Sequence, residues 1–445
     1  MKRLVILFCI FYYINYGYGQ SSCPKTFIEA KYKIENCETN VCDLSQDFTL
    51  IGMNKEALIE EDKFFEDGDM GLGDPKCLIE KDSNLKILPA INYFYRMLEK
   101  NDFVILNECH NYPQNRVFFY NILDSIKYFG FNSLFIETLS YAPNDSLYRY
   151  TKGIERWGYY TIENIFRQIS YKLGRSDYSL YSYEVYYPRK IDTLRRNDTT
   201  YFINKSDVKW LPIKADSLLL ANFFSPNDNI QREAEQALNI YQKILRNRLK
   251  KAFIYCGYTH AFKSNVYMAG MLKYLLHKDV YTIDQTYLRE HSDVKYENSL
   301  YTKYANVEYP FVITNKKNIP VHTIKRQSKN YITDTLFDLT IAAPRSIYIN
   351  NRPTWLELNG ERKRYNLKKF IQITELEDFL VAVYNDDENE EQASSTNRNE
   401  QVPVDIFQVK GKGDNYDLIL RPNRKYRLKL IKNSEIKIDK IINIP

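Results

Sequence analysis

Phe103-Val-Ile-Leu-Asn-Glu-Cys-His110 is an apolar run that ends in a carboxylate, a thiol and an imidazole. A run of β-branched and aromatic residues between polar residues predicts a buried strand. In an open α/β sheet, charged groups at the carboxyl end of such a strand enter the crevice where ligands bind. Glu108 and His110 are therefore the first candidates for a functional site.

Helix and strand patterns alternate around this stretch. Helices are predicted over 88–100, 113–129, 143–152, 161–173, 229–251 and 263–277, and strands over 103–108, 133–138, 179–185, 252–258 and 280–284. This alternation predicts an α/β fold with a mostly parallel central sheet and helices on both faces. Right-handed crossovers would bring all five strand ends to one edge of the sheet.

The pattern changes at both ends of this region, so four parts are predicted. Residues 1–19 resemble a signal peptide, 20–86 predict an irregular extension, 87–296 form the α/β domain, and 297–445 form a small antiparallel β-sandwich or barrel. The strands of this β module are predicted over 337–341, 355–358, 379–383, 404–409, 416–420 and 426–431, and its acidic stretch 386–403 is predicted to be a solvated loop.

The amino terminus indicates export. Met1-Lys-Arg3, an apolar stretch over 4–14 and the small residues of Gly17-Tyr-Gly19 are typical of a secretory signal peptide and too short to span a bilayer. A periplasmic or extracellular, envelope-associated protein is expected, with no transmembrane segment after signal removal. The net charge of +6 comes from Lys and Arg scattered along 445 residues, which argues against a nucleic-acid partner.

Export permits disulfides, but the cysteines leave their pairing open. Four cysteines precede the main domain, and they are expected to form disulfides or to remain free thiols: Cys23, Cys37, Cys42 and Cys77. Cys109 is expected to be a small buried hydrophobe instead of a nucleophile.

Ionisable groups stand at the end of every predicted strand. These are Glu108 with His110, Glu137, Glu184, His260 and Asp284. A single carboxylate at a strand end is often a solvated or capping residue, but Glu and Asp are rarely buried without partners, and five such ends together predict a polar cleft. Spacing of four residues on a helix adds two pairs, either ordinary surface pairs or substrate contacts: Glu163 with Arg167, and Arg232 with Gln236.

Several motifs together resemble one superfamily. They are Asn107-Glu-Cys-His110, Phe135-Ile-Glu-Thr138, Gly158-Tyr-Tyr-Thr-Ile-Glu163, Ser182-Tyr-Glu184, Arg232-Glu-Ala-Glu-Gln-Ala-Leu-Asn-Ile240, Cys256-Gly-Tyr-Thr-His260 and Thr282-Ile-Asp-Gln-Thr286. From residue 88 to 286 the chain resembles the superfamily of erythromycin esterase, the haem-uptake protein ChaN and Tiki-type proteins. The hallmark of that superfamily is a Gly-Glu-x-His turn after the first strand, a Glu after the second strand, and a Gly-x-x-His late in the domain. Asn107 stands where that family has Gly.

The first hypothesis is an exported hydrolase of an ester or lactone. His110 would take a proton from water, Glu108 or Glu137 would orient it, and Arg167 or Arg232 would stabilise the oxyanion. In a metal-assisted version of the same hydrolase, a divalent ion is held by His110, His260, Glu108 and Glu137.

Two alternatives stay open. A haem or other small-ligand carrier of the ChaN type would use aromatic residues near the cleft, namely Tyr141, Tyr159, Tyr160 and Tyr258, and Tyr160 is also a candidate substrate contact for the hydrolase. A non-catalytic envelope protein, favoured by Asn107, would bind a protein partner through the β module. The cofactor is therefore open among none, a divalent metal and haem, and the expected partner is a small molecule.

Overall fold

The computed structural model describes residues 27–36, 41–66, 84–139, 162–184, 192–196, 199–203, 211–213, 222, 225, 227–321, 325–328, 331–371, 378–386, 402–411 and 415–445. The predicted signal peptide, the predicted helix over 143–152 and most of the acidic stretch lie outside these ranges. The same holds for Tyr141, Tyr159, Tyr160, Cys23, Cys37, Cys77 and the side chain of Cys42.

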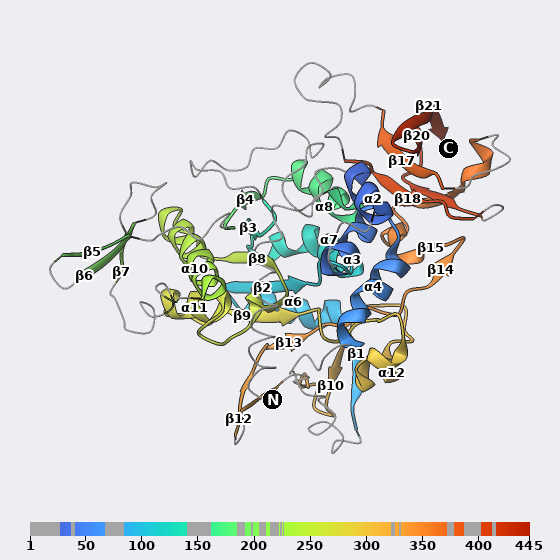
Figure 1. Cartoon of the computed structure of the whole chain (residues 1–445). Helices are drawn as coiled ribbons and strands as arrows, with labels where there is room; N and C mark the ends of the chain where they lie inside the picture. The colour runs from blue at the N-terminus through green and yellow to red at the C-terminus, as the bar shows by residue number, and fades with distance from the viewer. Residues whose placement is uncertain are drawn as a thin grey trace.

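A six-stranded sheet forms the centre of the molecule, in the order β13-β9-β2-β8-β3-β4 (Figure 1). Its strands are β2 (Phe103–Glu108), β3 (Ser133–Ile136), β4 (Ser179–Tyr181), β8 (Ala252–Gly257), β9 (Tyr281–Asp284) and β13 (Leu339–Thr340). Every neighbouring pair is parallel. The five strands predicted for the α/β domain are confirmed, and so is the parallel sheet.

Helices cover both faces of this sheet, as predicted. On one face lie α6 (Ala90–Lys100), α7 (Gln114–Ile126) and α8 (Asn164–Gly174), and on the other lie α10 (Asp228–Arg246) and α11 (Met268–Leu276). Side chains alternate between the faces along each strand, so Val104 and Leu106 pack with the first group while Phe103 and Ile105 pack with the second.

The amino-terminal region differs from the prediction of an irregular extension. Over 27–66 it contains three helices, α2 (Phe27–Asn36), α3 (Val41–Leu50) and α4 (Asn54–Glu66). Their apolar residues, including Phe27 and Phe48, pack against Ala382 and Ile406 of the β module. These helices are short and carry many acidic residues, so burial against a distant part of the chain, and not local pattern, stabilises them.

The chain after residue 296 also differs in part from the predicted β module. The segment after it contains α12 (Ser299–Tyr304) and returns to the α/β unit through β10 (Phe311–Thr314), which pairs with β1 (Lys86–Pro89), and through β13, which joins the central sheet. The strand predicted over 337–341 thus forms, but in the parallel sheet. The strand predicted over 355–358 is wrong, because Thr354–Glu357 form a 3-10 turn.

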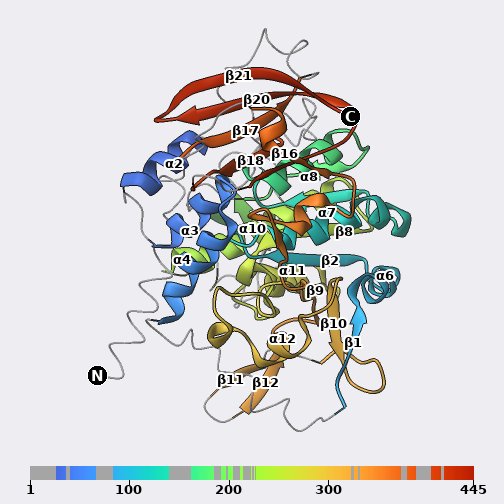
Figure 2. The same cartoon turned by 90° about the vertical axis from the view of Figure 1, so that its right-hand side faces the viewer.

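The rest of the carboxy-terminal region is an antiparallel β module, as predicted. Its four-stranded sheet has the order β18-β17-β20-β21, and a two-stranded ribbon, β16 with β19, packs on it. The bounds are β16 (Lys363–Asn366), β17 (Leu380–Asn385), β18 (Asp405–Gln408), β19 (Asp417–Leu420), β20 (Arg424–Lys432) and β21 (Glu435–Ile444). In Figure 2 this sheet lies at the top of the molecule, above α8, and β1 with β10 lies at the bottom.

Shorter strands complete the described chain. They are β5 (Asp192–Arg196), β6 (Thr199–Ile203), β7 (Leu211–Ile213), β11 (Lys325–Ser328), β12 (Tyr331–Thr335), β14 (Tyr348–Ile349) and β15 (Arg352–Pro353). Within the described ranges, we find no helix with the length and apolar character needed to cross a bilayer.

Candidate functional site

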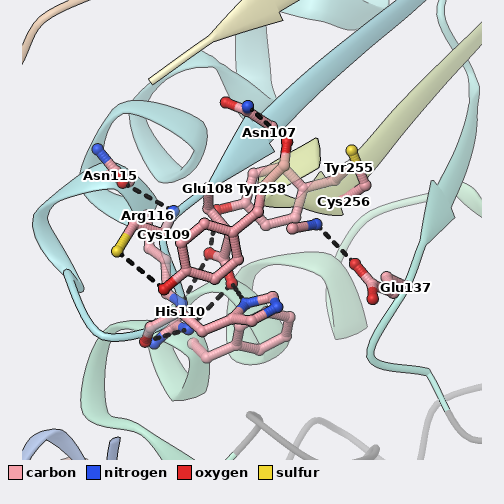
Figure 3. Close-up of polar contacts among 12 residues, drawn as sticks. Asn107, Glu108, Cys109, His110, Asn115, Arg116, Glu137, Tyr255, Cys256 and Tyr258 are labelled. Atoms are coloured by element: carbon pink, nitrogen blue, oxygen red, sulfur yellow. Dashed lines mark hydrogen bonds and ion pairs between the residues drawn. The ribbon is translucent and has the colours of Figure 1, made fainter. Parts of the chain in front are cut away.

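The carboxyl end of β2 carries a buried carboxylate with four hydrogen bonds. Arg116 donates from Nε and Nη2 to the two oxygens of Glu108 at 2.8 and 2.9 Å, and Tyr255 Oη donates at 2.5 Å. His110 Nδ1 lies 2.9 Å from Glu108 Oε1 (Figure 3). Burial by itself raises the pKa of Glu108, but Arg116 and His110 lower it to about 2, so this group is ionised at neutral pH.

Arg116 was not among the residues singled out from the sequence. It is fully buried on α7 and also donates from Nη1 to Glu163 Oε2 at 3.0 Å and from Nη2 to the His110 carbonyl at 3.1 Å. Burial lowers the pKa of Arg116, but the carboxylates of Glu108 and Glu163 raise it above its usual value, so the guanidinium stays charged. A signal for Arg116 existed, because it stands in the first turn of the helix that follows the tip of β2.

Glu163 belongs to this cluster through its bond to Arg116. It is the N-cap of α8, where its carboxylate accepts from the amides of Ile165 at 2.8 Å and Phe166 at 2.9 Å. The Glu163 carboxylate accepts from these amides and from Arg116, and the predicted pairing with Arg167 is not found among the described residues. Arg167 instead donates from Nε to the Val402 carbonyl at 3.1 Å, at the β module.

The His110 imidazole is held in one orientation. Because Nδ1 donates to the ionised Glu108, the tautomer that fits has its lone pair on Nε2. The ring lies over Gly257. A Cβ atom added to Gly257 would lie less than 3.0 Å from Nε2 and Cε1 of His110 and 3.3 Å from Oε2 of Glu137. Tyr258 packs edge-on against the same ring, with centroids 5.1 Å apart. Nε2 therefore lies on the side of the ring that faces the Glu137 cluster.

A second charged cluster surrounds Glu137, which follows β3. The Gly257 amide donates to Glu137 Oε2 at 2.6 Å, the contact drawn at Glu137 in Figure 3. Arg232 Nη2 and His260 Nε2 approach Oε1 at 3.0 and 3.2 Å. Burial raises the pKa of Glu137, but His260 and Arg232 together lower it well below its usual value. Glu137 is therefore a carboxylate whose two oxygens already have donors.

Arg232 joins Glu137 to Glu184. It donates to both oxygens of Glu184, from Nε at 3.0 Å and from Nη2, and Gln236 Nε2 donates to Glu184 Oε1 at 3.1 Å. The predicted pair of Arg232 and Gln236 on one face of its helix is confirmed. The Arg232 side chain is 26% exposed, so it is the accessible cation of this cluster.

His260, in the 3-10 turn Tyr258–Ala261, lies between two carboxylates. Its Nδ1 is 2.8 Å from Oε1 of Glu233, a residue not singled out from the sequence although it adjoins Arg232. Burial lowers the pKa of His260, but Glu233 and Glu137 raise it to about 10, so its imidazole is protonated at neutral pH. The described residues contain no group of three His, Cys, Asp or Glu side chains that could hold a metal ion.

Asp284 belongs to a structural network. Asn107 Nδ2 donates to Asp284 Oδ1 at 3.1 Å and to the Tyr258 carbonyl at 2.9 Å, while Asn107 Oδ1 accepts from the Gln285 amide at 2.6 Å. Asp284 also caps the turn at Thr286. Asn107 lies inside β2 and has no positive φ, and its side chain ties the end of β2 to the residues that follow β8 and β9.

Cys109 is a buried neutral thiol, as predicted. Burial raises its pKa to about 12, and its Sγ lies 3.1 Å from Tyr258 Oη and 3.4 Å from Glu61 Oε1. Tyr258, a candidate haem contact in the sequence, therefore turns its hydroxyl toward this thiol. Glu61 belongs to α4, so an amino-terminal helix contributes a side chain next to Cys109.

Comparisons with family models, with curated proteins and with solved structures find no match to this chain.

Proposed function

We propose that the chain is an exported hydrolase that uses His110 to activate water against an ester or lactone. The observation that carries the proposal is the Glu108–His110 pair. An ionised carboxylate, fixed by Arg116 and Tyr255, holds Nδ1 and leaves Nε2 as the basic nitrogen. The resemblance to the erythromycin esterase superfamily supports an ester or lactone as the substrate class.

The proposed reaction uses this pair as its general base. His110 Nε2 accepts a proton from water as the oxygen attacks the carbonyl carbon, which gives a tetrahedral oxyanion. When the intermediate collapses, the bond to the alkoxide breaks, and His110 returns the proton to that leaving group. Glu108 stays ionised throughout and stabilises the imidazolium that forms transiently, as a carboxylate does in other carboxylate–histidine pairs.

Arg232 is the group we assign to the developing oxyanion. Its Nε and Nη2 engage Glu184 and Glu137, and its Nη1 points to His260, with 3.4 Å between the two nitrogens. His260 is protonated, so it adds a second positive charge here and does not serve as a base. The two histidines therefore have different roles, with His110 as the base and His260 as a fixed cation that holds Glu137.

The test is turnover of a panel of nitrophenyl esters and lactones by purified protein and by the His110→Gln variant. We expect kcat/KM to fall by about 10²-fold or more, the usual loss when a general base is removed. His277→Asn is the matched control, because His277 is exposed at the end of α11 and Asn readily adopts its left-handed backbone conformation. Absence of turnover by the wild-type protein, or equal rates for wild type and His110→Gln, would contradict the proposal.

A chelator separates the two versions of the hydrolase. The metal-free mechanism predicts the same kcat/KM before and after exhaustive dialysis against a chelator. Loss of activity that a divalent ion restores would favour the metal-assisted version.

A further inference from the structure

Tyr258 has a backbone conformation that tyrosine rarely adopts. Its φ of 31° lies in the left-handed region, where a bulky side chain is strained. Strain of this kind persists only where surrounding groups hold the residue, and it concentrates at functional sites. The Tyr258 ring packs against the His110 imidazole, with 5.1 Å between the ring centroids and 89° between the ring planes. The ring of this strained residue therefore restricts the proposed general base.

Hydrogen bonds at both ends hold Tyr258 in place. Asn107 Nδ2 donates to its carbonyl oxygen at 2.9 Å, and its hydroxyl lies 3.1 Å from Cys109 Sγ (Figure 3). Asn107 lies in β2, and Cys109 follows the last residue of that strand. The segment that carries His110 therefore also holds the ring that packs against it.

Glu61 of α4 contacts the same thiol. Its Oε1 lies 3.4 Å from Cys109 Sγ, and its Oε2 accepts from Arg289 Nη1 at 2.7 Å. The side chains of Arg289 and Glu61 are only 5% and 9% exposed, so solvent ions hardly screen the charge of this carboxylate. Burial raises the pKa of Cys109 to about 12, so its thiol is neutral at physiological pH.

The direction of these hydrogen bonds follows from the thiol. A neutral thiol has one hydrogen and a carboxylate can only accept, so Cys109 donates to Glu61. The Tyr258 hydroxyl then donates to Sγ, because the thiol hydrogen is already used. Donation thus runs from Tyr258 to Cys109 to Glu61, and the buried carboxylate sets the orientation of the tyrosine hydroxyl.

A purely structural role accounts for part of this arrangement. Asp62, the next residue of α4, accepts from His291 Nδ1 and from the Ser292 amide, both at 2.6 Å. The donors to both carboxylates belong to the segment that follows β9, so Glu61 and Asp62 together fasten α4 to that segment. This role explains the bond between Glu61 and Arg289. It does not explain why the second oxygen of Glu61 reaches a thiol beside the proposed general base.

We propose that Glu61 is a positioning residue of the His110 site and acts through Cys109 and Tyr258. The inference rests on the proposed hydrolase reaction, in which His110 is the base. Glu61 fixes the tyrosine hydroxyl, the hydroxyl fixes the ring, and the ring keeps the imidazole aligned with Glu108. An amino-terminal helix thereby contributes to the geometry of a site on the α/β sheet.

The first test compares the wild type with Glu61→Gln and with Asp62→Asn, the matched control. Glutamine keeps an acceptor for Arg289 but presents an N–H group to Sγ, which reverses the order of donation. We expect kcat on the best ester or lactone of the panel to fall by about five- to tenfold, the size of one lost hydrogen bond, with KM within about twofold of wild type. Asp62→Asn weakens the same attachment of α4 and should leave both constants within about twofold. Equal losses of kcat in the two variants would overturn the proposal.

The ¹⁵N NMR signals of the imidazoles decide the same question without turnover. Glu61→Gln should move the signals of His110, whereas Asp62→Asn should move those of its partner His291 and leave His110 in place. If the wild type hydrolysed no ester or lactone but His110 responded in this way, the proposed function would fail and the positioning role would stand. If the wild type were active and His110 kept its signals in Glu61→Gln, the positioning role alone would fail.

Cys109→Ala tests the route between Glu61 and the imidazole. Alanine removes the link to Tyr258 and leaves the bonds of α4 to Arg289 and to the segment after β9 intact, so this variant decides the question even where Glu61→Gln does not fold. It should move the His110 signals and lower kcat as Glu61→Gln does. Adding Glu61→Gln to Cys109→Ala should then cause no further change. Additive effects, or wild-type His110 signals in Cys109→Ala, would contradict the proposed route.

Discussion

Gly257→Ala is the smallest change that tests the geometry of the His110 site. Gly257 ends β8 with φ −88° and ψ 153°, a backbone conformation that any residue adopts. Alanine therefore causes no backbone strain at this position. Its methyl group would nevertheless overlap His110 Nε2 and Cε1 and approach Glu137 Oε2 to 3.3 Å.

The size of the effect follows from the overlap. Normal separation of about 3.5–4.0 Å between such atoms requires the imidazole to move by about 1 Å. A shift of this size moves the imidazole away from Glu108. The hydrogen bond between His110 Nδ1 and Glu108 Oε1, now 2.9 Å long, would then be too long to persist. Misplacement of a catalytic group by about 1 Å costs on the order of 10² in rate, so kcat/KM should fall by about 100-fold.

Two measurements check this prediction. The first is kcat/KM on the best ester or lactone of the panel. The second is ¹⁵N NMR of the imidazoles, which is tractable because the chain has only 5 histidines. The His110 nitrogen signals should move toward those of an imidazole without a carboxylate partner, while the signals of exposed His277 should stay in place.

Gly360→Ala is the control for the general cost of an added methyl group. Gly360 has φ +87°, and a methyl group on it would meet no other atom within 4 Å, so the substitution should cost about 1 kcal/mol of stability through backbone strain alone. The His110 signals and kcat/KM should not change. If Gly257→Ala kept its His110 signals and a kcat/KM within about twofold of wild type, the placement of the imidazole over Gly257 would be refuted.

Two further predictions concern stability. The pKa of His260 is raised from 6.5 to about 10 in the folded chain, so its stabilising effect is complete below pH 6.5 and is lost as pH rises through about 10. In urea unfolding, the free energy of unfolding should fall by about 1.4 kcal/mol per pH unit within that window. If the same pH dependence persisted in His260→Gln, it would belong to another group. Asn107→Ala should cost about 3 kcal/mol in the same assay, since it leaves buried partners at Asp284 and Gln285 unsatisfied. Asn247→Ala, which removes one exposed bond to Lys243, should cost less than about 1 kcal/mol, and equal losses would contradict the role given to Asn107.

Local sequence patterns predicted much of the α/β core. The run from Phe103 to Glu108 forms β2, and the other four strands predicted for the α/β domain also form in the same parallel sheet. These patterns are informative because a strand buried on both faces needs a continuous apolar run, and its polar end must leave the core. For the same reason, the sequence located Glu108, His110, Glu137, Glu184 and His260 at one edge.

Local pattern failed where an element is stabilised by distant partners. The helices of 27–66 are buried against the β module, and β13 has only two residues, which pair with β9. Neither segment shows a strong hydrophobic periodicity in its sequence. Contacts between residues far apart in the chain decide both structures, and a single sequence does not reveal such contacts.

The sequence by itself placed Glu108, His110, Glu137, Glu184 and His260 at one edge of the sheet, and the tertiary structure decided the role of each candidate residue. Asp284 became a structural cap, Arg167 turned to the β module, and His260 became a fixed cation between Glu137 and Glu233. The physical reason is that the charge on a buried group depends on its burial and on the partners around it. Those partners, such as Arg116 for Glu108, are brought together only when the chain folds.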